Sequence, residues 1–82
     1  MPMAYVLITA ETGGIKSVLR SLKKIDAVKE TYRVYGVYDI IATIKTEKMD
    51  KLKKIVTEDL RSLDKVRSTL TMIVVEETKR SP

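Results

Sequence analysis

Hydrophobic and polar residues alternate along this chain with two periods, one typical of strands and the other of helices. Residues 4–9 form a short, β-branched apolar run, which predicts a central strand. From Ile15 the apolar residues recur every three or four positions, which predicts an amphipathic helix that ends near Lys24. Thr12 or one of the two glycines after it is expected to provide the N-cap region of this helix.

The second half of the chain predicts a hairpin, another helix and a last strand. Polar and apolar residues alternate over 28–35, as in a half-exposed edge strand, and a short turn containing a glycine separates this run from the apolar strand 40–44. A helix with Thr46 as its expected N-cap follows, and its apolar stripe reaches Leu63. Residues 66–75 then form a long apolar strand.

The element order β-α-β-β-α-β predicts an α+β, ferredoxin-like fold. In this fold a four-stranded antiparallel sheet carries both helices on one face, and right-handed crossovers place the first and third strands in its centre. These are also the two most apolar strands here. A chain of 82 residues is expected to form one domain, 1–82, with a core of about residues 4–77 and a polar end, 76–82, that frays.

Two helices can cover only one face of this sheet, whereas three of the strands carry apolar residues on both faces. In the first strand, Tyr5 and Leu7 point away from Val6 and Ile8. An apolar surface of this size is typical of an association site. The pattern therefore predicts a homodimer whose sheets pack face to face about 10 Å apart, as in a dimeric α+β barrel, or a larger ring of such pairs.

Composition removes most enzyme chemistries. The chain lacks His, Cys, Trp and Phe, so zinc sites, thiolate nucleophiles, Ser-His-Asp triads and disulfides are excluded. No pair of carboxylates has suggestive spacing, and we expect a protein without catalytic residues, metal or cofactor. No apolar run approaches ~18 residues and no signal peptide is present, which favours a cytoplasmic protein without a membrane span. A Lys-rich chain without Asn, Gln or Cys is typical of thermophilic sources.

The formal net charge is +5, and the distribution of charge matters more than its sum. Acidic and basic residues alternate along most of the chain. One cluster without acids, consisting of Lys16, Arg20, Lys23 and Lys24, falls on a single face of the first predicted helix. This face is either a solvated helix surface or a patch that binds anions or nucleic acid.

The turn before the third strand is the first candidate binding site. It contains Gly36, Val37, Tyr38 and Asp39. Gly36 can adopt a positive φ and allow a ligand close to the backbone. The carboxylate of Asp39, partly desolvated beside an apolar strand, would suit a bound ammonium group. Alternatively, Asp39 caps its own turn through a local hydrogen bond.

Two hydroxyl groups in the last strand are the second candidate site. Thr69 and Thr71 project from the same face of the strand and could donate hydrogen bonds to a carboxylate. Alternatively, they are simply β-forming residues on a half-exposed face.

Taken together, these residues resemble the effector-binding domain, called RAM, of the Lrp/AsnC or feast/famine transcription regulators. The resemblance covers about residues 4–77 and rests on an ordered set of short patterns. They comprise the apolar first strand, Val18-Leu19 with Leu22, Val28-x-x-x-Tyr32, Gly36-x-x-Asp39 running into Ile40–Ile44, Leu52 with Ile55-Val56, and Val66-x-x-Thr69-x-Thr71. The chain starts directly at the first strand, so it resembles a stand-alone module without the helix-turn-helix domain, and sequence-specific DNA binding of its own is not expected.

The resemblance implies a function and a site. In the family, dimers assemble into octamers or similar rings, and an amino acid or related effector binds between dimers. Backbone groups of Gly36, Val37 and Tyr38 and the side chain of Asp39 would hold the zwitterion. Thr69 and Thr71, from the same or a neighbouring subunit, would help to hold its carboxylate.

A stand-alone module of this kind would modulate transcription by assembling with itself or with full-length regulators. Two other functions stay open at this stage. One is a small dimeric α+β-barrel enzyme, and the other is a basic module associated with nucleic acid.

Overall fold

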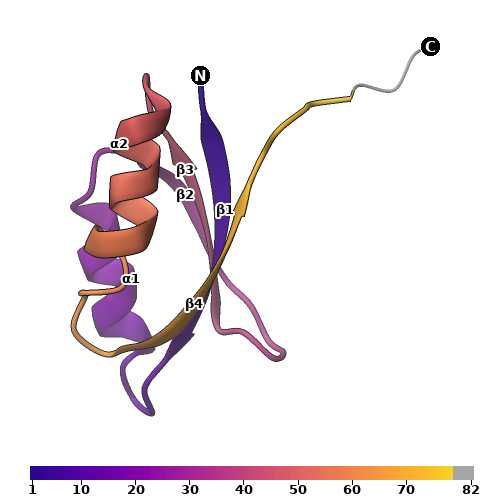
Figure 1. Ribbon diagram of the computed structural model, residues 1–82. Coiled ribbons are helices and arrows are strands. Elements are labelled where there is room, and N and C mark those ends of the chain that lie inside the picture. Colours follow the sequence, from indigo (N-terminus) through magenta and orange to yellow (C-terminus); the bar gives the residue numbers. More distant parts are fainter. Residues whose placement is uncertain (79–82) are drawn as a thin grey trace.

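The computed structural model describes residues 1–78 as a sheet with a layer of helices on one side (Figure 1). The sheet has four antiparallel strands in the order β2-β3-β1-β4, which confirms the predicted ferredoxin-like α+β fold. Along the chain the elements are β1 (Met3–Ala10), α1 (Ile15–Lys23), β2 (Val28–Arg33), β3 (Ile40–Lys45), α2 (Met49–Lys54), the π-helix η1 (Ile55–Asp59) and β4 (Val66–Ile73).

The hydrophobic core lies between the sheet and the helices. Alternate residues of β1 are buried, and they point toward the helix layer. They meet the apolar stripe of α1, in which Val18 and Leu22 are fully buried, and Leu52 of α2. The larger fully buried apolar side chains are Val6, Ile8, Val18, Leu22, Ile40, Ile44, Leu52 and Leu60. The periods read from the sequence thus identify the inward-facing positions.

The start of the second helix differs from the prediction. Thr46 was expected to be its N-cap, but the N-cap position belongs to Lys48. The Thr46 N–H donates to the carbonyl of Pro2 (3.1 Å), and the Thr46 hydroxyl donates to the carbonyl of Lys48 (2.7 Å). Because the bond to Pro2 ties Thr46 to the N-terminal segment beside β1, the chain turns into the helix only two residues later.

The second helix also ends differently. We expected one helix with an apolar stripe as far as Leu63, whereas α2 passes into η1, where the N–H of Leu60 donates to the carbonyl of Ile55 (3.0 Å). A hydrogen bond between residues five positions apart is typical of a π-helix. Ile55 and Leu60, which it joins, are both buried in the core.

The outer strands β2 and β4 are shorter than predicted. Both end two residues early, at Arg33 and Ile73. Of the polar end, residues 76–78 are exposed, and the predicted fraying of 79–82 falls outside the described residues.

Gly14 occupies the tightest glycine position. A Cβ added there would lie 2.7 Å from the Cβ of Lys65 and 3.1 Å from the carbonyl oxygen of Glu11. Lys65 itself has a positive φ of 73°, so the backbone on its side of the contact is already in a conformation that non-glycine residues rarely adopt. Gly14 also serves as the N-cap of α1, in line with the prediction that Thr12 or a glycine fills this region.

We therefore expect Gly14→Ala to lower the free energy of unfolding by about 1–3 kcal/mol, because the contact with Lys65 must open. Gly36→Ala is the matched control, since an added Cβ at Gly36 meets no atom within 4 Å and φ there is not positive. It should be neutral or stabilising by up to about 1 kcal/mol. Urea denaturation of both variants measures the difference, and equal midpoints would contradict the proposed clash.

Candidate functional site

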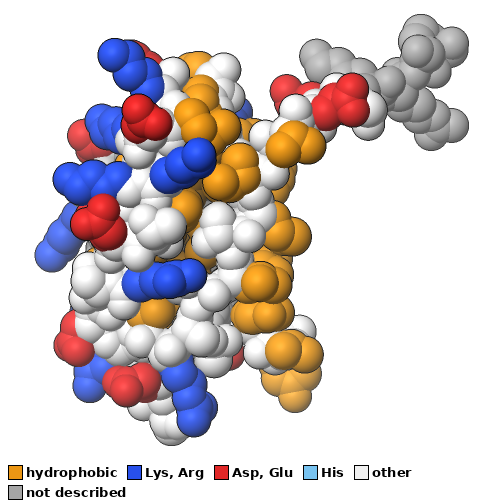
Figure 2. All heavy atoms as spheres, viewed as in Figure 1, with side chains coloured by type: hydrophobic (Ala, Val, Ile, Leu, Met, Phe, Trp, Pro, Cys, Tyr) orange, Lys and Arg blue, Asp and Glu red, His pale blue; other side chains and the backbone are white. Residues whose placement is uncertain are grey.

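The sheet face that points away from the helices is apolar and uncovered in a single chain. The strand register places Tyr5, Leu7, Ile41, Leu70 and Met72 together on this face, since Leu7 pairs with Ile41 and Leu70, and Tyr5 pairs with Met72. Leu70 and Met72 are 47% and 48% exposed. Figure 2 shows the hydrophobic side chains gathered along this side of the molecule. We call this surface the open sheet face.

Polar groups lie at one end of the open sheet face. Thr43 is only 2% exposed, and its hydroxyl has no hydrogen-bond partner among the described residues. Nearby, the hydroxyl of Tyr32 donates to Glu30 Oε2 (3.1 Å). This bond to a carboxylate raises the pKa of Tyr32 above its usual value of 10.0. The sequence analysis did not single out Thr43, because a threonine within an apolar strand has no distinctive spacing.

Asp39 closes the ladder between β1 and β3. Its N–H donates to the carbonyl of Ile8 (2.9 Å), and its carbonyl accepts from the N–H of Val34 (2.9 Å). In addition, Asp39 Oδ2 accepts from the N–H of Ala10 (2.9 Å). The carboxylate therefore accepts a hydrogen bond from the backbone at the end of β1, where a strand carbonyl would otherwise do so. It does not cap its own turn, which was the alternative considered from the sequence. Because this bond uses Oδ2, Oδ1 can accept from a ligand.

The turn that contains Gly36, Val37 and Tyr38 projects beyond the end of the sheet, away from the helix layer (Figure 1). Val37 is 87% exposed, Tyr35 is fully exposed, and Tyr38 is half-buried. The expectation of a positive φ at Gly36 is wrong, since Gly13 is the one glycine with positive φ in this structure. The turn is long enough to reverse the chain without a left-handed residue, and its backbone at Gly36 is open to solvent.

Thr69 and Thr71 share one face of β4, as predicted, and this face points toward the helices. They pair with Ile8 and Val6 of β1, whose side chains are buried under the helix layer. Both threonines are half-buried, and the Thr69 hydroxyl is inaccessible to solvent and has no hydrogen-bond partner among residues 1–78.

The structure brings Thr69 to the same end of the sheet as Asp39. Ile8 pairs with Thr69 on one side of β1 and accepts the N–H of Asp39 on the other. Asp39 and Thr69 therefore lie on opposite sides of β1. Since neighbouring strands are about 4.8 Å apart, the two residues are separated by roughly 10 Å. Thr71 lies two residues farther along β4, so a single chain does not place it beside the carboxylate of Asp39.

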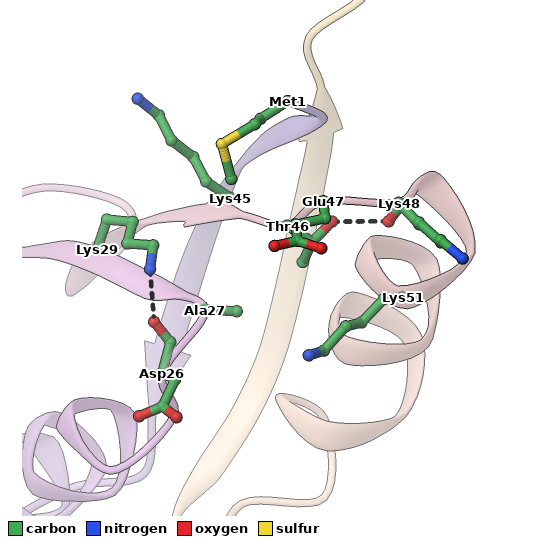
Figure 3. Close-up of a pocket in the computed structure, with 9 residues that line it drawn as sticks. All are labelled: Met1, Asp26, Ala27, Lys29, Lys45, Thr46, Glu47, Lys48 and Lys51. Carbon is green, nitrogen blue, oxygen red and sulfur yellow. Dashed lines mark hydrogen bonds between the residues drawn. The ribbon is translucent and has the colours of Figure 1, made fainter.

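Two of the surface hollows lie at opposite ends of the sheet. The larger, about 350 Å³, is at the opposite end of the sheet and contains none of the predicted site residues (Figure 3). Lysines and two carboxylates line it together, and Lys29 Nζ donates to the carbonyl of Asp26 (3.0 Å). The other, about 300 Å³, lies at the start of β4, at the end of the sheet that holds Asp39, and the predicted site residue Thr69 lines it together with Arg61, Val66, Arg67 and Ser68.

The described residues also limit other kinds of site. Within residues 1–78 no group of three or more acidic side chains is placed to hold a metal ion. No helix in the same range is long and apolar enough to cross a membrane.

Comparison with known proteins identifies the family. The chain matches the Lrp/AsnC ligand binding domain over residues 3–82, and it therefore belongs to this family. None of the curated proteins compared with the chain matches it.

Solved structures of similar proteins agree with this assignment. FFRP-DM1 is 33% identical, with 92% of this chain and 100% of that chain covered and a TM-score of 0.87. The hypothetical protein PHS023 from Pyrococcus horikoshii is 34% identical over 94% of this chain and 93% of that one, with a TM-score of 0.85. The transcriptional regulator NMB0573 from Neisseria meningitidis, solved as a complex with L-Met, has a TM-score of 0.83. The match covers 98% of this chain and 53% of the regulator. The two sequences are 17% identical, so the similarity shows a shared fold alone.

Proposed function

We propose that this protein is a non-enzymatic effector-binding module that senses an amino acid or a similar small molecule and modulates transcription through its assembly state. Membership of a ligand-binding domain family supports the effector, and the complex of NMB0573 with L-Met shows that one regulator of this fold takes an amino acid. The observation that carries the proposal is the Asp39 carboxylate, held by the N–H of Ala10 at the base of an exposed turn.

The residues at this turn match the charges of a zwitterion. Asp39 Oδ1 would accept hydrogen bonds from the ligand's ammonium group, while Oδ2 keeps its bond to Ala10. Backbone groups of Gly36, Val37 and Tyr38 would bind the rest of the ligand backbone. Thr69 and Thr71, contributed by the same or a neighbouring subunit, would donate to the ligand's carboxylate.

The site needs a second copy to exclude water. In one chain the turn is largely open to solvent, and small-molecule sites generally bury most of the ligand surface. We propose that copies pair through the open sheet face and that the pairs assemble into an octamer or another ring, which brings a neighbour over the turn. The same contacts would let the module join full-length regulators of its family.

Calorimetric titration with each of the twenty amino acids tests this function. At least one should bind, and Asp39→Asn should weaken that binding about tenfold or more, because the amide can still accept from Ala10 but carries no charge for the ammonium group. Asp26→Asn, which removes an exposed carboxylate at the other end of the sheet, is the matched control and should bind like the wild type. Absence of binding by every amino acid, or unchanged affinity in Asp39→Asn, would refute the proposal.

A further inference from the structure

The surplus positive charge of the helix layer is concentrated on α1. Residues 15–24 contain Lys16, Arg20, Lys23 and Lys24 and no acidic residue, and all four cations are exposed. The second helical segment, α2 with η1, is neutral, because its three lysines are matched by Asp50, Glu58 and Asp59. Figure 2 shows Lys and Arg side chains, with Asp and Glu side chains among them, over the helices and hydrophobic side chains over the opposite side.

The open sheet face has a different character. The strand register gives it two charged residues along the described strands, Glu30 and Lys45, which cancel in net charge. The molecule therefore has an apolar, neutral side and a basic side. Packing through the open sheet face would leave the helix layer uncovered.

The helix layer lacks the apolar groups that a protein or lipid partner requires. Within residues 1–78 the large exposed apolar side chains lie on the sheet, in the turn between β2 and β3 and near the chain ends, with the exception of Met49. Protein interfaces are centred on buried apolar or aromatic residues, and helices that bind membrane surfaces insert an apolar face. On α1 the apolar stripe is already packed against the sheet. A polyanion needs no such anchor, because contacts to phosphates alone supply its affinity.

We infer that the basic surface of α1 binds the phosphate backbone of double-stranded nucleic acid independently of base sequence. The cations of α1 extend over eight residues from Lys16 to Lys23, about 10 Å along the helix axis. This length matches about three successive phosphates of one strand. Binding by this surface does not depend on the effector or on Asp39.

Fluorescence anisotropy with a labelled duplex of arbitrary sequence tests this surface. The helix variant combines Lys16→Ala, Arg20→Ala and Lys23→Ala. The control combines Lys29→Ala, Arg33→Ala and Lys45→Ala, three exposed cations on strands β2 and β3, and thus has the same net charge. Affinity is measured between about 50 and 200 mM salt, with a second duplex of unrelated sequence and a labelled polyglutamate of equal charge.

The wild type should bind both duplexes equally, and more weakly as salt rises. The helix variant should lose about tenfold or more in affinity at low salt, and the slope of log affinity against log salt should fall by about 2–3. The strand control should retain the wild-type affinity and slope. Equal losses in both variants, no binding by the wild type at the lowest salt, or tighter binding of polyglutamate than of the duplex would each overturn the inference.

Discussion

Replacing Leu70 by glutamate should leave a folded chain that no longer pairs with a second copy. Leu70 lies on the open sheet face and is about half exposed in the single chain, so the substitution removes little from the fold itself. In a face-to-face dimer the same position is covered. An unpaired charge would then be buried, at a cost of several kcal/mol, and the dissociation constant should rise by about 100-fold or more.

Light scattering of dilute samples checks this result. The wild type should give a mass that is a multiple of the 9.3 kDa chain, and Leu70→Glu should give the mass of one chain. Thr57→Glu places the same new charge at an exposed position of η1 on the helix side and should keep the wild-type mass. A wild type with the mass of a single folded chain would remove both the dimer and the proposed site between copies.

Truncation of Leu22 should have the largest effect on stability. This side chain is fully buried, where α1 packs on the sheet. Leu→Ala substitutions in protein cores cost about 2–5 kcal/mol because a cavity remains. A chain of this length has a total stability of only about 4–12 kcal/mol, so Leu22→Ala should unfold a large fraction of the protein at modest urea concentrations.

Urea denaturation followed by circular dichroism measures this loss. Leu19→Ala is the control, since Leu19 lies on the same helix but is half-buried and packs at the margin of the core. Its midpoint should fall by less than half as much as that of Leu22→Ala. A larger loss from Leu19 would mean that the core is centred elsewhere on α1.

The sequence predicted the architecture because periodicity determines which residues are buried. The continuous apolar runs 4–9 and 40–44 identified the central strands, and the excess of apolar residues on both faces identified the open sheet face. These properties follow from neighbouring residues alone. The ends of elements were less predictable, as Thr46 shows, because its partner Pro2 is distant in sequence.

The candidate site was predictable in its residues but not in its geometry. The sequence singled out Asp39, yet its bond to Ala10 joins residues 29 positions apart and depends on the β1–β3 pairing. The sequence also could not show which face of the sheet the Thr69 side chain points to, because this depends on the pairing of Thr69 with Ile8 of β1. A pattern shows that two threonines share a face, whereas only the paired strands show which face it is.

The hydrogen bond from Ala10 to Asp39 also couples the turn mechanically to the middle of the sheet. β1 is the strand to which both β3 and β4 pair, and the turn is fastened to its last residue. A shift of Asp39 would therefore act on the end of β1, where Ala10 also pairs with Val66 at the start of β4. In the function proposed above, a ligand at the turn would thus act directly on the strand that joins β3 and β4.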